Sequence, residues 1–127
     1  MITLTLTVLP ESLAICRCDR ASDLPTWAMA ASFFSVTRTQ DELSIVCPEA
    51  HIPADVVCER GWRSLKFEGP FDFNLTGILV AVAAPLAEAG ISVFAVSTYE
   101  TDYVLVRQAQ LAAAIDTLSA CGHKIQS

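Results

Sequence analysis

The sequence has few charged residues and no long hydrophobic run. Charged residues make up 17% of the 127 residues and apolar residues 53%, and the mean hydropathy is +0.46. The longest apolar run, Ile78 to Ala87, contains Pro85 and is far shorter than the roughly 20 residues of a membrane-spanning helix. The first residues lack the basic region of a signal peptide. We therefore expect no membrane partner. The scarcity of charge predicts that some apolar surface is buried against another chain.

Positive charge is scarcest of all, with 8 Lys and Arg against 14 Asp and Glu and a net charge of −6. The basic residues are scattered, whereas nucleic-acid binding needs a basic patch, so we expect no nucleic-acid partner. The chain also has no G-x-S-x-G, no phosphate-binding glycine-rich loop and no H-E-x-x-H motif. These absences predict that the protein is not an enzyme, although a small enzyme of amino-acid metabolism remains an alternative.

The cysteines are odd in number, and no export signal accompanies them. These features predict reduced thiols and a cytoplasmic location. Cys16 and Cys18 form a C-x-C pair in a strand-like segment, so their side chains share one face. Our interpretation is that they are small core residues. A zinc site is the alternative, and it would require the fold to gather His51 and His123. We expect no metal and no cofactor.

Apolar periodicity divides the first half of the chain into short elements. Met1–Val8 alternates apolar residues with threonine, which is typical of a half-buried strand. Further strands are predicted over Ser12–Cys18, Phe33–Arg38, Leu43–Cys47 and Arg63–Phe67. Short helices are predicted over Leu24–Ala31, with Pro25 suited to the first position, and over Ala54–Arg60, where Gly61 ends the helix.

The second half has one strong helical pattern. Its apolar stripe consists of Leu75, Ile78, Leu79, Val82 and Leu86. Asn74 is the candidate N-cap and Gly90 the candidate C-terminal cap, and Pro85 should bend the helix. A hairpin of Ile91–Tyr99 and Tyr103–Arg107 follows, then a helix lined by Leu111, Ile115 and Leu118 and ended by Gly122, then a strand over His123–Gln126.

This order predicts an α+β fold with two subdomains. Residues 63–127 read β-α-β-β-α-β, the ferredoxin-like order, with an antiparallel sheet and both helices on one face. Residues 1–62 read as a degenerate copy of the same unit. The strand over Ile91–Val96 is apolar on both faces, and helices cover only one. We therefore expect the companion half or a second subunit to cover the other face.

Two motifs resemble those of ACT domains. Asn74-Leu75-Thr76-Gly77-Ile78 is similar to the family's Asp/Asn-x-x-Gly-Ile/Leu helix start, and Leu86-Ala87-Glu88-Ala89-Gly90-Ile91 to its Leu-Ala-x-x-Gly-Ile helix end. Segments 33–39, 41–47 and 97–103 extend the resemblance to bacterial tandem-ACT proteins related to the CASTOR arginine sensors. The resemblance covers nearly the whole chain and implies two ferredoxin-like ACT subdomains of a regulatory protein.

The resemblance also implies a ligand and a site. The ligand is a free amino acid, held between the helix start and the strand corner near an ACT–ACT or dimer interface. A homodimer and an unidentified protein partner are implied with it. The implied ligand-binding residues are Asn74, Leu75, Thr76, Gly77, Ile78, Leu79, Ser97, Thr98, Tyr99 and Asp102.

The chemistry of these residues agrees with an amino-acid ligand. The first turn of a helix offers unpaired N–H groups to a carboxylate, and Gly77 lets a ligand approach the backbone closely. Asp102 is the candidate partner of the ammonium group, and Tyr99 could wall the side chain. Each residue also has a purely structural interpretation: Asn74 as a cap, Gly77 as a packing glycine, Asp102 as a turn residue and Tyr99 as a core residue. A ligand-free interaction or assembly module therefore stays open.

Overall fold

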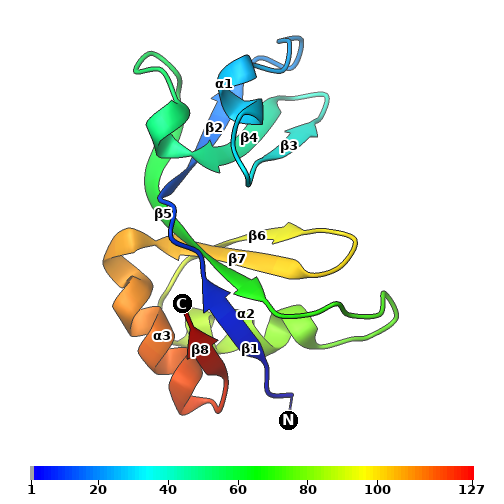
Figure 1. Cartoon of the computed structure of the whole chain (residues 1–127), viewed down its shortest axis with the longest axis vertical. Coiled ribbons are helices and arrows are strands. Elements are labelled where there is room, and N and C mark those ends of the chain that lie inside the picture. The colour runs from blue at the N-terminus through cyan, green and yellow to red at the C-terminus, as the bar shows by residue number, and fades with distance from the viewer. Residues whose placement is uncertain (1) are drawn as a thin grey trace. The chain divides into compact units, whose positions relative to one another are not determined.

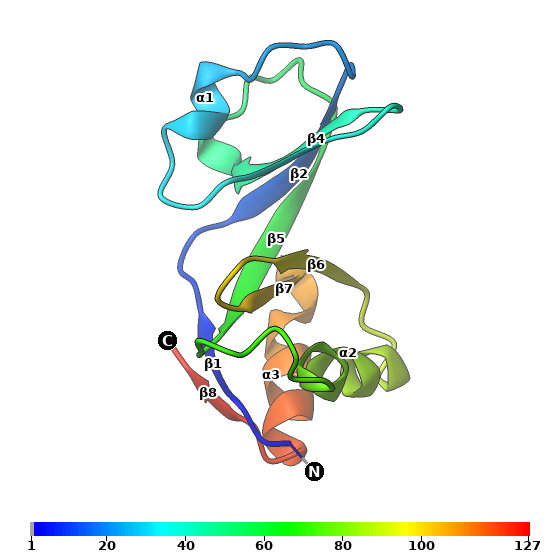
Figure 2. The ribbon, with the colours of Figure 1, turned by 90° about the vertical axis from the view of Figure 1, so that its right-hand side faces the viewer.

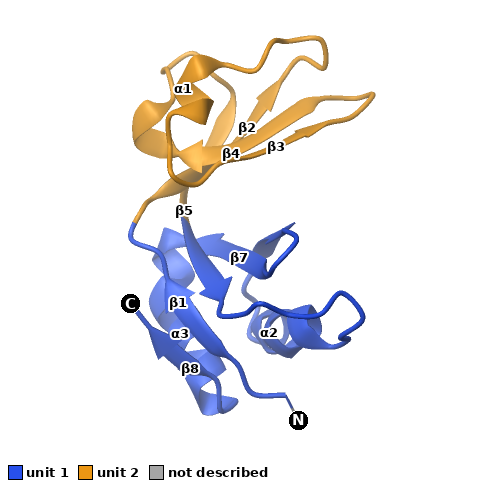
Figure 3. Ribbon diagram, turned by 45° about the vertical axis from the view of Figure 1, so that its right-hand side comes forward, with its two compact units in different colours: residues 1–10, 63–127 blue, residues 11–62 orange. Residues whose placement is uncertain are grey.

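The computed structural model describes residues 2–127 and divides the chain into two compact units. Unit 1 contains the residues up to Pro10 together with Arg63–Ser127, and unit 2 contains Glu11–Trp62 (Figure 3). The predicted division at 62/63 thus differs from the structure in the first ten residues. These residues carry strand β1 (Thr5–Val8), which pairs within unit 1. Met1, included in the predicted first strand, lies outside the described residues.

Unit 1 has the predicted β-α-β-β-α-β order (Figure 1). Its elements are the second half of β5 (Cys58–Phe67), α2 (Ile78–Glu88), β6 (Val93–Ser97), β7 (Asp102–Arg107), the 3₁₀ turn η2 (Gln108–Gln110), α3 (Leu111–Ala120) and β8 (Lys124–Gln126). The strand order is β8-β1-β5-β7-β6, so β1 is an additional strand between β5 and β8. It runs antiparallel to β5 and parallel to β8. The other pairings with a defined register are antiparallel.

The core of unit 1 lies between this sheet and the two helices. Figure 2 shows α2 and α3 side by side. The large fully buried side chains here are Leu6, Leu65, Phe67, Val82, Leu86, Val104, Val106 and Leu118. They come from both helices and from the central strands. Because burying each such side chain contributes roughly 1.5–3 kcal/mol, this core holds the helices against the sheet.

Helix α2 begins later than predicted, and Asn74 does not cap it. The N-cap residue is Gly77, with φ of 84°, and no side chain of the described residues caps this end. The Asn74 backbone N–H instead donates to Asp72 Oδ1 at 2.8 Å, in a turn that precedes the helix. A left-handed φ at the cap favours glycine, and a Cβ there would lie 3.3 Å from Ile2 Cδ1.

The predicted end of α2 is confirmed. Gly90 has φ of 75°, and its N–H donates to the Ala87 carbonyl at 3.0 Å. The Ile91 N–H donates to the Leu86 carbonyl at 2.9 Å, and this pair of bonds closes the helix as the Leu-Ala-x-x-Gly-Ile motif predicts.

Unit 2 repeats the order in a shorter form. Its elements are β2 (Leu13–Cys18), α1 (Thr26–Met29), β3 (Ser35–Arg38), β4 (Leu43–Pro48), the 3₁₀ turn η1 (Glu49–His51) and the first half of β5. The strand order β3-β4-β2-β5 is again ferredoxin-like. The two helical positions hold only the four-residue α1 and the three-residue η1. Strand β5 therefore ends one unit and begins the other.

The helix predicted over Ala54–Arg60 is wrong. The helical turn lies earlier, at η1, and β5 already begins at Cys58. A helix this short has too few hydrogen bonds to offset its nucleation, whereas strand pairing with β2 satisfies the backbone. Gly61 does not end an element but lies within β5, where the register against β2 shifts. Its N–H donates to Glu49 Oε2 at 2.9 Å.

The structure also bears on the membrane and metal questions. Within residues 2–127, no helix has the length and apolar character needed to cross a bilayer. In the same range, no three side chains among His, Cys, Asp and Glu gather as metal ligands would. Cys16 is buried in the core of unit 2, as the core interpretation predicts, and Cys18 is partly buried against that core. Cys47 is buried in the same core. Burial, with the neighbouring thiol Cys47 next in importance, raises the pKa of Cys16 to about 12.

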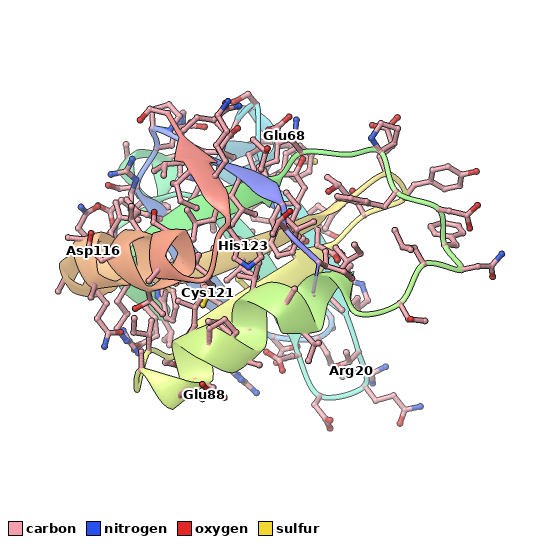
Figure 4. All side chains as sticks on the ribbon, turned by 90° about the horizontal axis from the view of Figure 1, so that it is seen from below. Arg20, Glu68, Glu88, Asp116, Cys121 and His123 are labelled. Atoms are coloured by element: carbon pink, nitrogen blue, oxygen red, sulfur yellow. The ribbon has the colours of Figure 1, made fainter. Side chains whose placement is uncertain are left out.

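The buried His123 compensates for the proline inside α2. Pro85 has no N–H, so it leaves the carbonyl of Ala81, four residues earlier, without its helical partner. His123 Nε2 lies 2.9 Å from that oxygen, and His123 Nδ1 accepts a hydrogen bond from the Leu4 N–H at 3.1 Å. The neutral ring protonated at Nε2 satisfies both groups. Figure 4 shows His123 between α2 and α3.

We predict that His123→Ala lowers the free energy of unfolding by about 2–4 kcal/mol, because it leaves two backbone groups unpaired and opens a cavity. In a Pro85→Ala background the new N–H can bond the Ala81 carbonyl, so the same substitution should cost about 1 kcal/mol less. Urea denaturation of the four proteins measures the difference. Equal costs in both backgrounds would contradict a shared role for this carbonyl.

Candidate functional site

The loop before α2 and the β6–β7 turn form the two walls of one pocket in unit 1. Its volume is about 120 Å³. The lining residues are Phe71, Asp72, Phe73, Leu75, Ile78, Thr98, Tyr99, Glu100, Thr101 and Asp102. The helix start and the strand corner, which are far apart in the sequence, therefore face one cavity.

The β6–β7 turn is held by the side chains of two threonines. The Thr98 N–H donates to the Thr101 carbonyl at 2.8 Å, and Thr98 Oγ1 donates to the same oxygen at 3.0 Å. Thr101 Oγ1 donates to the Phe67 carbonyl at 2.6 Å, and this residue is only 8% exposed. Thr101 thereby ties the turn to the end of β5.

The loop opposite is joined to the turn through its backbone. The Phe71 N–H donates to the Glu100 carbonyl at 2.9 Å, just after the cis Gly69–Pro70 bond. A Cβ on Gly69 would lie 3.1 Å from the Phe71 nitrogen and 3.2 Å from the Glu100 oxygen. Both neighbours are backbone atoms, so a side chain at this position would force them to move apart by a few tenths of an ångström.

Two aromatic side chains form the rim. The ring centroids of Phe73 and Tyr99 are 4.8 Å apart at an interplanar angle of 67°, an edge-to-face contact between the two walls. The rings are nevertheless 72% and 80% exposed. The interpretation of Tyr99 as a core residue is therefore wrong. Large apolar groups left this open at a pocket rim are typical of a binding surface.

The charge of the pocket is one-sided. Asp72, Glu100 and Asp102 all line it, and none of the lining residues in the described chain is Lys, Arg or His. Asp102, the first residue of β7, is half-buried and pairs with Ser97 of β6. The start of α2 lies beside these carboxylates and offers backbone N–H groups that have no partner within the helix. The pocket thus sets three acidic side chains beside the first turn of a helix.

The predicted site residues divide into three groups in the structure. Leu75, Ile78, Thr98, Tyr99 and Asp102 line the pocket. Asn74 lines an adjoining cavity of about 310 Å³, which shares Phe71, Asp72, Phe73 and Tyr99. Thr76, Gly77, Leu79 and Ser97 are absent from both linings.

Five lining residues were not predicted: Phe71, Asp72, Phe73, Glu100 and Thr101. Asp72 had a detectable signal, because an Asp two residues before Asn74 can accept the N–H that forms this turn. Thr101 had a weaker sequence signal, since the hydroxyl group of Ser or Thr in a hairpin turn often forms a hydrogen bond with the backbone. For the two phenylalanines the sequence carried no signal that separates a pocket rim from a core.

These features together define a chain of two ferredoxin-like units, one of which carries a pocket between its first helix and its central hairpin. The family model of the ACT domain matches residues 57–120, and a second model, of an N-terminal domain, matches residues 11–55. The chain belongs to the ACT domain family, and the resemblance stated from its motifs is confirmed.

Several relatives in sequence are named as cytosolic arginine sensors. The chain is 35% identical over 98 residues to the cytosolic arginine sensor for mTORC1 subunit 1 of Bos taurus, which covers 68% of this chain and 30% of the relative. It is 34% identical over 101 residues to the putative protein CASTOR3P of Homo sapiens, covering 69% and 62%. The chain therefore spans less than two thirds of the length of these relatives.

Solved structures agree with the fold. Protein Atu0741 from Agobacterium tumefaciens matches 98% of this chain and 93% of its own, with 42% identity and a TM-score of 0.94. The aspartokinase alpha and beta subunits match 95% and 99%, with a TM-score of 0.66. At 14% identity the second likeness shows the fold alone.

We predict that Thr101→Val lowers the free energy of unfolding by about 1–2 kcal/mol, because the buried Phe67 carbonyl loses its donor. Thr101→Ser keeps the hydroxyl and should retain most of that free energy. Thermal denaturation followed by circular dichroism compares the two variants. If serine and valine destabilise the protein equally, the packing of the threonine methyl group, and not the hydrogen bond, holds the turn.

Proposed function

We propose that this protein is a regulatory sensor of a free amino acid, bound in unit 1 between the loop before α2 and the β6–β7 turn. The observation that carries the proposal is the pocket, which sets three carboxylates and aromatic rings beside the start of a helix. The chain's membership of the ACT domain family supports the proposal. The names of the relatives favour sensing over catalysis and a cytoplasmic location.

The ligand's α-ammonium group would bind Asp102. The ligand's carboxylate would accept hydrogen bonds from the backbone N–H groups in the first turn of α2. Each charge-assisted hydrogen bond contributes about 1.5–3 kcal/mol. Three or four of them approach the roughly 8 kcal/mol of a micromolar site once ordering costs are subtracted. The ligand-binding set proposed from the family, Asn74 to Leu79 with Ser97 to Tyr99 and Asp102, stands as part of this proposal.

The side chain of the ligand would face the acidic and aromatic part of the pocket. Asp72 and Glu100 carry the negative charge that suits a cationic side chain, and the Tyr99 face suits a cation by cation–π attraction. Arginine is therefore the first amino acid to test, as the relatives' names also suggest. Leu75 and Ile78 add an apolar wall, which makes leucine and phenylalanine the natural comparison ligands.

The proposal includes a homodimer and a response to ligand. The exposed rings of Phe73 and Tyr99 would be covered by a second copy or by a protein partner. Binding would then shift the population of an assembly or conformational state. These rings also favour the competing function, a ligand-free interaction module. That module would dimerise equally well with or without amino acids.

We predict that one amino acid, with arginine first, raises the melting temperature at millimolar concentration, because a ligand of the folded state alone stabilises it. Asp102→Asn should weaken that ligand about 10- to 100-fold, the loss of one charge-assisted hydrogen bond. Isothermal titration calorimetry measures the affinity.

Asp116→Asn is the matched control, because Asp116 is exposed on α3, outside the pocket lining (Figure 4). It should bind like the unmodified protein. Unchanged affinity in Asp102→Asn would show that another group binds the ammonium. No thermal shift with any of the twenty amino acids, together with an unchanged dimer in light scattering, would support the interaction module.

A further inference from the structure

The core of unit 2 gathers four of the five cysteines on one face of its sheet. Cys16 and Cys18 lie two residues apart on β2, so their side chains share a face. Cys47 lies on β4, and Cys58 begins β5. Cys16 and Cys47 belong to the buried core, and Cys18 and Cys58 pack against it. Cys121 follows α3 in unit 1. All five are free thiols. Sulfur is thus concentrated in one small core.

The strand register places two of these cysteines directly opposite each other. Cys16 on β2 and Cys58 on β5 are antiparallel partners. The next pair along is hydrogen-bonded, since the Arg17 N–H donates to the Val57 carbonyl at 3.0 Å. Bonded and non-bonded pairs alternate, so Cys16 and Cys58 form a non-hydrogen-bonded pair, in which the Cα atoms lie about 4.5 Å apart. That spacing falls within the roughly 4.4–6.8 Å of disulfides.

The register disfavours the other pairings with Cys16. Cys47 lies opposite Ala14, and so diagonal to Cys16, where the spacing is about 7–8 Å. Besides burial, the Cys47 thiol is near enough to raise the pKa of Cys16, but the Cys47 backbone is too distant for a relaxed disulfide. Cys18 lies opposite Leu43 on β4. Only Cys58 combines the right face with the right backbone spacing.

We propose that Cys16 and Cys58 are a redox modification site: a peroxide oxidises them to an intramolecular disulfide that joins β2 to the start of β5. In the first step the Cys58 thiolate attacks one oxygen of hydrogen peroxide and the O–O bond breaks. The released hydroxide takes up the proton that the Cys58 thiol lost on ionisation, so the products are Cys58 sulfenic acid and water. In the second step Cys16 Sγ attacks Cys58 Sγ, the S–O bond breaks, and the Cys16 proton leaves with the hydroxide as water. Two thiols lose two electrons in all, and one peroxide becomes two waters.

Burial sets the order of the two steps. Cys58 is half-buried and accessible to a small oxidant, whereas Cys16 is 1% exposed. Burial raises the pKa of Cys16, so Cys16 stays a thiol and reacts with peroxide more slowly than the accessible Cys58. Because β5 is the last strand of unit 2 in the order β3-β4-β2-β5, the disulfide fastens that strand to the rest of the unit. A dithiol reductant restores the open form.

The test uses the full chain treated with hydrogen peroxide. We expect the mass of the intact protein to fall by two hydrogen atoms and peptide mapping to join Cys16 to Cys58. The melting temperature should rise by about 5 °C or more, because the disulfide closes a long loop. Cys121→Ser should show the same changes, whereas Cys58→Ser should show neither. In Cys16→Ser, the first step stops at a Cys58 sulfenic acid that dimedone traps.

Three results would overturn the proposal: five free thiols after oxidation, a disulfide that joins other cysteines or two chains, or mass gain by oxygen without a crosslink. The peptide map of the oxidised protein without substitutions distinguishes these results. The test therefore remains valid even if Cys58→Ser folds poorly. Cys58→Ala offers a second variant of similar volume.

Discussion

The candidate site depends on one buried hydrogen bond, from Thr101 Oγ1 to the Phe67 carbonyl. Phe67 is fully buried at the end of β5, so its carbonyl has a fixed position in the core of unit 1. The chain leaves that point toward Gly69 and the loop that forms one pocket wall, while Thr101 belongs to the turn that forms the other. The bond therefore anchors both walls to the same end of one strand. The Phe71–Glu100 backbone bond then sets their separation.

Beyond these anchors the site is open. Phe73 and Tyr99 touch each other across the pocket, yet most of each ring is exposed. The cost of leaving them exposed is recovered only when a ligand or partner covers them. A base fixed by hydrogen bonds with an exposed aromatic rim suits the proposed sensor, because the base would hold the recognition groups while the rim would differ between the free and bound states. In the proposed sensor the acidic lining would add selectivity by repelling anionic side chains.

The sequence predicted those parts of the fold that depend on local patterns. The ferredoxin-like order of both units and the cap at Gly90 followed from periodicity and motif, and both are confirmed. The exact start of α2 was not predicted correctly. Gly77, with its left-handed φ, is the N-cap residue, and Asn74 belongs to the preceding turn with Asp72. The insertion of β1 between β5 and β8 also escaped prediction, since strand pairing over such separation leaves no local signal. The pocket residues Phe71 and Phe73 were missed for the same reason.

The contrast between the two units explains why thiols gather in only one of them. Unit 1 has helices of eleven and ten residues, which cover its sheet with leucine and valine. Unit 2 has a helix of four residues, too short to bring many large side chains to its sheet. Its core accordingly combines the small residues Ala14, Cys16, Ala28 and Cys47 with Leu43, Ile45 and Ile52. Cysteine fills that space as a small hydrophobic residue and brings reactive sulfur into the core. A weak helical cover is therefore the physical origin of the chemistry that unit 2 carries.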